Sequence, residues 1–200
     1  VSESFFRIHN FFLSCTAWLR SNPYLTSRPN RGRNLTRSHC FMLQQKILRV
    51  QQQIRQQKLS ALVLGNYGFT TTDDLLYYLL LRTPEYAVCF IPARGRPTLY
   101  AISFETPELE KTLPEMIVKP ITKSISELVK NHISSRASIG VRYRTTPIEV
   151  QEQLLKIPRV RWKKFSGAEQ IMSIKLPEEQ KHLLRACAIG DKVFAELVVR

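Results

Sequence analysis

The chain has 200 residues, of which 44% are hydrophobic and 23% charged, an ordinary composition for one folded domain with extra segments. No uninterrupted apolar stretch approaches the roughly 18 residues of a membrane-spanning helix, so we expect no membrane partner. The net charge of +14 favours an acidic partner. The basic residues are nevertheless scattered over several predicted elements without interleaved aromatic residues, which is typical of a solvated surface and argues against nucleic acid.

Residues 1–41 differ from the rest of the chain in composition, because they contain six Arg, no Lys and a single acid, Glu3. Residues 21–40 are rich in Ser, Thr, Arg and Asn and show no periodicity, which predicts a disordered linker. An Arg-rich and Ser-rich beginning is typical of a transit peptide, which would place an otherwise cytoplasmic protein in a mitochondrion or plastid. An equally open interpretation is that residues 1–41 are not native, since the regular pattern begins at Met42.

A regular alternation of helices and strands follows. Leu43, Ile47, Val50 and Ile54 recur at helical spacing and predict an amphipathic helix whose other face is Gln, Lys and Arg. Short apolar runs bounded by turn residues predict strands at 59–64, 86–91, 98–102, 116–119, 137–141 and 160–165. The second and third of these strands form a hairpin through Arg94-Gly95, and the last one is basic, which predicts an edge position.

Helix signals separate these strands. Asp73-Asp74 precedes an apolar helix, and Thr106-Pro107 is interpreted as a cap with Pro at the first helical position. Capping boxes are predicted at Ser124-x-x-Glu127, Thr146-x-x-Glu149 and Ser166-x-x-Glu169, and Pro177 begins a long helix that runs to the end of the chain. The sequence therefore predicts an α/β fold of three layers, in which a mixed sheet of five or six strands carries helices on both faces.

The residues that could carry chemistry are dispersed. The cysteines (Cys15, Cys40, Cys89, Cys187) and histidines (His9, His39, His132, His182) show no metal-binding spacing. We expect Cys89 and Cys187 to be buried, and we expect structural or surface roles for His132 and His182. The adjacent carboxylates Asp73-Asp74 and Glu178-Glu179 point about 100° apart on a helix and are better explained as helix-terminus charges. We therefore predict no catalytic, cofactor-binding or metal-binding residue in this chain.

The order of the predicted elements resembles a known family. The helix leads into LSALVL at 59–64, then Tyr-Tyr-Leu at 77–79, the hairpin, the strand IGV at 139–141 and the run IMSIKLPEE at 171–179. This order over residues 43–200 is similar to the N-terminal domain of the creatinase/prolidase/Xaa-Pro aminopeptidase (pita-bread metallopeptidase) family. There are departures: Leu75 replaces the family's Asn, Leu80-Leu81 its Thr-Gly, and Met172 the Arg of its linker.

The resemblance implies a non-catalytic domain at 42–170 that dimerises the enzyme and roofs its active site, followed at 171–200 by a linker and the first helix of a catalytic domain. It also implies that the dinuclear metal (Mn, Co or Zn) and its ligands, two Asp, one His and two Glu, belong to a catalytic domain after Arg200. Alone, the chain is expected to be inactive on proline-containing peptides and truncated at the start of the catalytic domain. The alternatives are a stand-alone interaction module for an acidic partner and a degenerate gene fragment.

Overall fold

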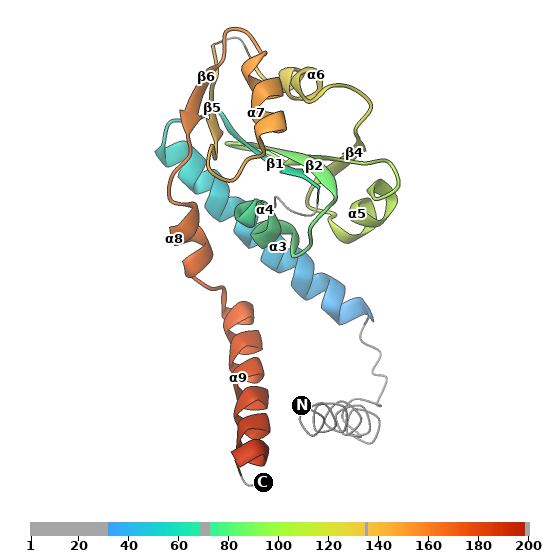
Figure 1. Ribbon diagram of the computed structural model, residues 1–200, viewed down its shortest axis with the longest axis vertical. Helices are drawn as coiled ribbons and strands as arrows, with labels where there is room; N and C mark the ends of the chain where they lie inside the picture. The colour runs from blue at the N-terminus through green and yellow to red at the C-terminus, as the bar shows by residue number, and fades with distance from the viewer. Residues whose placement is uncertain (1–31, 69–72, 135, 199–200) are drawn as a thin grey trace, which may run out of the picture. The chain divides into compact units, whose positions relative to one another are not determined.

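The computed structural model describes residues 32–68, 73–134 and 136–198 of the chain (Figure 1). The helices are α3 Gly32–Gln56, α4 Asp74–Leu80, α5 Thr106–Thr112, α6 Ile125–Lys130, α7 Ile148–Leu155, α8 Ala168–Ser173 and α9 Pro177–Val198. The strands are β1 Ala61–Tyr67, β2 Tyr86–Pro92, β3 Thr98–Ala101, β4 Ile117–Pro120, β5 Ser138–Val141 and β6 Arg161–Lys164. The chain divides into two compact units, Val1–Arg37 and Ser38–Arg200, and every one of these strands belongs to the second.

The strands form one mixed six-stranded sheet in the order β4-β3-β2-β1-β5-β6. β2 runs antiparallel to β1 and β3, while the β1–β5, β5–β6 and β3–β4 pairs are parallel. The predicted hairpin is confirmed, and Gly95 in its loop takes a φ of +96°, which favours glycine. The basic strand β6 lies at an edge, as its composition predicted.

Helices cover both faces of the sheet, so the predicted three-layer architecture is confirmed. Alternate residues of β1 divide between two cores, because Leu62 and Leu64 join the core under α3, α4, α5 and α8, whereas Ala61 and Val63 join the core under α6 and α7. We call these the α3 face and the α7 face (Figure 1). Cys89 of β2 points to the α3 face, and its full burial raises the pKa of its thiol to about 12.

The first described helix is longer than predicted. We expected it to begin near Leu43, but α3 begins at Gly32, so the predicted linker at 21–40 is wrong from Gly32 onward, and its remainder lies outside the described residues. No Pro or Gly follows Gly32 before the end of the helix at Gln56. Because extending a formed helix is far easier than nucleating one, the helix continues through this segment despite its weak periodicity.

Three cap assignments are wrong, while the capping box of Ser124 with Glu127 is confirmed. The N-caps of α5, α7 and α8 are Glu105, Pro147 and Gly167, and none of them makes a side-chain cap hydrogen bond. At α8, tertiary contacts replace the predicted cap. The side chain of Gln57 in the α3–β1 turn bonds both the N–H and the carbonyl of Ser166, and Gly167 takes a φ of +82°.

The long C-terminal helix is confirmed as α9, but its surroundings differ from the expectation. Residues 180–197 are all exposed, including His182, as predicted, and Cys187, which we expected to be buried. Large apolar side chains on α9 such as Leu184 and Phe194 are each 71% exposed. Burial of Cys187 would require a neighbour against this helix, and the described residues provide none there. None of the described helices is long and apolar enough to cross a bilayer.

Candidate functional site

A buried ionic cluster lies where β1 and β5 end. Because these strands are parallel neighbours, their carboxyl ends meet at one edge, which brings Arg142 after β5 close to Asp73 at the start of α4. The Asp73 carboxylate is fully buried and accepts hydrogen bonds from the N–H groups of Leu75 and Leu76 at 2.9 and 3.1 Å. It also accepts from Arg142 Nη1 at 3.0 Å and from Thr145 Oγ1 at 2.7 Å. Four hydrogen-bond donors of the protein therefore surround the buried Asp73 carboxylate.

The second carboxylate of the pair, Asp74, also bonds Arg142 Nη1, and Glu169 on α8 lies 3.5 Å from Arg142 Nη2. The predicted helix-terminus role of Asp73 is confirmed, because it is the N-cap of α4. The sequence reasoning missed Arg142, because only the parallel pairing of β1 with β5 brings the residue after the predicted strand 137–141 close to Asp73. A guanidinium that neutralises both carboxylates leaves neither of them free as a general base, so this cluster joins α4, α8 and the sheet rather than performing chemistry.

A second ionic contact joins α3 to the beginning of α9. Lys46 is 1% exposed, and its Nζ lies 2.9 Å from Glu179 Oε1 and donates to the Tyr78 carbonyl at 3.0 Å. The same ammonium lies 4.3 Å from the centre of the Tyr78 ring. The sequence predicts Lys46, the one lysine of α3, on the polar face of the helix, and this is wrong because three partners replace its water.

The titration of Glu179 reflects these contacts. Burial alone would raise its pKa, but a hydrogen bond of 2.8 Å from the Leu176 N–H and the pairing with Lys46 hold the pKa below its ordinary value. The other member of the adjacent pair, Glu178, contacts Lys181 of its own helix at 2.8 Å. Glu178 and Glu179 therefore have separate partners, and they do not form an acid/base pair.

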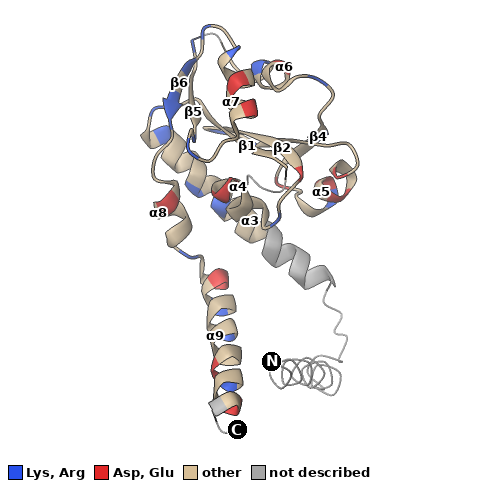
Figure 2. Cartoon of the chain, viewed as in Figure 1, with Lys and Arg blue, Asp and Glu red and all other residues tan. Residues whose placement is uncertain are grey.

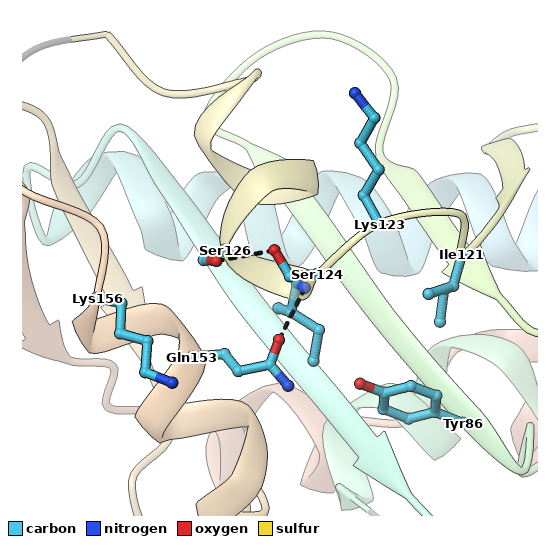
Figure 3. Close-up of a pocket in the computed structure, with 8 residues that line it drawn as sticks. Tyr86, Ile121, Lys123, Ser124, Ser126, Gln153 and Lys156 are labelled. Carbon is cyan, nitrogen blue, oxygen red and sulfur yellow. Dashed lines mark hydrogen bonds between the residues drawn. The ribbon is translucent and has the colours of Figure 1, made fainter.

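An open groove of about 570 Å³ lies on the α7 face, between the start of α6 and α7 (Figure 3). It is lined by Tyr86, Ile121, Lys123, Ser124, Ile125, Ser126, Gln153 and Lys156. The Ile125 N–H donates to Gln153 Oε1 at 2.9 Å, and the hydroxyls of Ser124 and Ser126 lie 3.1 Å apart. The lining offers hydroxyl, amide and ammonium groups but contains no acid.

The hydroxyl of Ser124 does contact a carboxylate, since it donates to Glu127 Oε2 at 2.8 Å. The hydrogen bonds from the Ser124 hydroxyl and backbone N–H lower the pKa of Glu127, which makes it a weaker base. This contact is the confirmed capping box, and its geometry stabilises α6 rather than activating the hydroxyl. The groove can therefore hold a polar ligand but lacks an activated nucleophile.

His132 packs against the sheet at the end of α6. Its Nε2 lies 2.7 Å from the hydroxyl of Tyr100, and its ring stacks on Phe90 with centroids 4.8 Å apart. Partial burial, followed by the charge of Lys119, lowers its pKa, so the neutral imidazole is favoured. The predicted structural role of this histidine agrees with these contacts.

The described residues do not fit a dinuclear metal centre. No three His, Cys, Asp or Glu side chains among them come together closely enough to hold one ion. The adjacent carboxylates Asp73 and Asp74 are already bonded by Arg142. No step that depends on a metal is assigned to these residues.

No protein-family model and no curated protein matches the sequence. Solved structures do match the fold. A proline dipeptidase from Streptococcus pneumoniae aligns over 64% of this chain and 98% of its own at 14% identity and a TM-score of 0.53. The creatinase/prolidase N-terminal domain of an X-Pro dipeptidase from Streptococcus pyogenes aligns over 62% and 96% at 12% identity and a TM-score of 0.50.

The dipeptidase PepE from Mycobacterium ulcerans aligns over 78% of this chain at 18% identity and a TM-score of 0.63, and the match spans 43% of that protein. The solved chains that are matched over nearly their whole length thus include an isolated N-terminal domain, whereas less than half of the longer dipeptidase is matched. The described part of this chain therefore has the fold of the creatinase/prolidase N-terminal domain.

Proposed function

We propose that this chain serves as the non-catalytic N-terminal domain of a Xaa-Pro peptidase-like metallopeptidase, in which it supports dimerisation and covers the active site. The observation that carries the proposal is the fold match over 96% of an isolated creatinase/prolidase N-terminal domain. The chemistry of the described side chains is consistent with it, because their carboxylates serve as caps and ion-pair partners rather than as a ligand cluster.

The contact between Lys46 and Glu179 supports a positioning role. It ties the first turn of α9 to the middle of α3, and therefore fixes where the chain leaves the sheet domain. The exposed apolar side chains of α9 begin directly after this anchor, at Leu183 and Leu184. In a longer enzyme such an anchor would set the place from which a following domain extends.

Metal binding and assembly test the proposal on the purified 200-residue chain. Titration calorimetry with Mn²⁺, Co²⁺ and Zn²⁺ should show no tight binding, and sedimentation equilibrium should show a reversible dimer. Tight binding of one of these ions would contradict the non-catalytic role, and a monomer at all accessible concentrations would remove the dimerisation role.

A second candidate function, an interaction module for an acidic protein, is favoured by one feature. Residues 156–164 contain five cations and no acid, and they include the edge strand β6. Binding of this kind should weaken steeply as salt rises from low to physiological concentration, because screening reduces attraction between exposed charges. Binding that does not respond to salt would remove this candidate.

A further inference from the structure

The two edge strands of the sheet, β6 and β4, differ in the backbone hydrogen-bonding groups that point away from the sheet. In β6, the N–H of Arg161 donates to Ala137 at 2.9 Å, and the N–H of Phe165 donates to Val141 at 3.0 Å. Because backbone groups alternate in direction along a strand, those of Trp162 and Lys164 point away from β5. No other described strand pairs with this side of β6, so its outward N–H and C=O groups are free to form a ladder.

The opposite edge, β4, lacks this capacity. The N–H groups of Ile117 and Ile121 donate inward, to Pro97 and Ala101, each at 2.8 Å. The outward positions are therefore Val118 and Pro120. Proline has no N–H, so Pro120 interrupts the row of donors that an added strand would need.

Positive charge accompanies the open edge. The cations of this region are Lys156, Arg159, Arg161, Lys163 and Lys164. Their side chains form no ion pair with any residue that the structure describes. Figure 2 shows the blue of Lys and Arg along β6. A segment that approaches this edge would meet uncompensated positive charge.

The side chains of β6 alternate between the two faces of the sheet. Phe165 joins the core of the α3 face, so Arg161 and Lys163 project to that side. Trp162 projects to the α7 face, where it shares a shallow depression with Tyr143 and Leu155, which are 41% and 60% exposed. A strand laid along β6 would therefore find Arg161 and Lys163 on one side, and on the other the aromatic and aliphatic surface around Trp162, with Lys164 beside it.

We propose that β6 is the docking edge for an extended acidic segment of a partner protein, which adds to the sheet as a further strand. The backbone groups of Trp162 and Lys164 supply the ladder, and the alternating surfaces select a segment in which acidic and apolar residues alternate. This inference rests on the second candidate function, since it specifies where and how an acidic partner binds. A basic edge can also serve only to prevent aggregation, and in that case it binds nothing.

Fluorescence anisotropy of the full chain tests the inference with a labelled peptide of about eight residues that alternates Glu and Val, a typical strand length. A second peptide carries the same side chains, with N-methyl groups on the backbone nitrogens of one edge. A third alternates Lys and Val, and a thymidine oligonucleotide of equal charge is the competitor. The acidic peptide should bind, the N-methylated one about tenfold more weakly, and the basic one not at all.

Matched variants locate the site. Lys163→Glu/Lys164→Glu should weaken the acidic peptide at least about tenfold, whereas Lys111→Glu/Lys192→Glu, which makes the same charge change at exposed positions elsewhere, should stay within about twofold. Thermal unfolding checks that each variant is folded. Equal weakening by the two variants would overturn the assignment to β6.

The remaining outcomes separate the inference from the candidate function on which it rests. Equal binding of the N-methylated and unmodified peptides would overturn strand addition while leaving a charge-driven acidic partner. Failure of the acidic peptide to bind at low salt would overturn both strand addition and the acidic-partner function. Preferential binding of the oligonucleotide would overturn the inference in favour of a nucleic-acid surface.

Discussion

The two faces of the sheet hold their helices by different means. The α3 face buries charged groups, because Asp73 is fully buried beneath Arg142 and Lys46 is buried beside Glu179. The α7 face relies on close apolar contact, and its described helices α6 and α7 form no ion pair with the sheet. At Gly65 of β1, an added Cβ would lie only 2.9 Å from Val150 Cγ1 of α7.

This difference shows which kind of change each face tolerates. Removing one partner of a buried ion pair leaves an unpaired charge in the folded state. The folded state is then destabilised relative to the unfolded state, because water hydrates this charge in the unfolded chain. An increase in side-chain volume destabilises the fold most where a helix packs directly on a glycine. The α3 face should therefore be sensitive to charge and the α7 face to size.

The largest effect is expected from Arg142→Met. The change leaves the Asp73 carboxylate buried without its cation, and should lower the free energy of unfolding by about 3–5 kcal/mol in urea denaturation. The exposed neighbour variant, Arg144→Met, is the control and should change stability by less than about 0.5 kcal/mol. Similar values for the two variants would mean that the α3 face does not depend on this buried charge.

Glu179→Gln should destabilise the chain by about 3 kcal/mol, because it leaves the buried ammonium of Lys46 without an opposite charge, with only neutral acceptors and the Tyr78 ring around it. The control is Glu178→Gln, whose partner Lys181 is exposed. Adding Lys46→Met to Glu179→Gln should recover much of the loss, as a double-mutant cycle in urea would show. Additive losses would contradict the pairing.

Gly65→Ala tests the α7 face, where the new methyl group would collide with Val150. Overpacking of this kind should cost about 1–3 kcal/mol. Val150→Ala in the same chain should restore part of the stability, because it opens the space that the methyl group needs. If Gly65→Ala alone leaves urea denaturation unchanged, the close contact between α7 and β1 is wrong.

The smallest effect is expected from His132, which contacts Phe90 and Tyr100 of the sheet. Burial, with the charge of Lys119, lowers its folded pKa, so the unfolded chain binds more protons as the pH falls through the ordinary histidine value of about 6.5. Stability should therefore be highest above that pH and decrease below it. In His132→Gln this part of the decrease should disappear from melting temperatures measured between about pH 8 and 5.5. An unchanged profile would exclude His132 as its source.

The elements of the fold were predictable because their signals are local. The short apolar run of β1 and the Gly95 turn identify the strands and the hairpin, and the basic composition of β6 identifies an edge. The start of α8 was not predictable in detail, since hydrogen bonds from Gln57, more than one hundred residues away, compete with the local capping pattern at Ser166.

The buried ionic contacts were missed for the same physical reason. Asp73 and Arg142 are 69 residues apart, and nothing in either segment indicates the other without a correct strand order. Lys46 lies at the flank of the apolar stripe, three residues after Leu43 and four before Val50, but nothing near it in sequence predicts its partner Glu179. Sequence periodicity identifies which face of a helix is apolar, but not which charged residue a distant segment will cover.

Our central proposal is that this chain, which has the creatinase/prolidase N-terminal fold, is a non-catalytic domain. The most direct test is hydrolysis of a Xaa-Pro dipeptide by the purified 200-residue chain with saturating Mn²⁺, Co²⁺ or Zn²⁺. We expect no hydrolysis above the rate of the metal alone. Metal-dependent turnover that rises in proportion to the concentration of the chain, and is lost on unfolding, would contradict it.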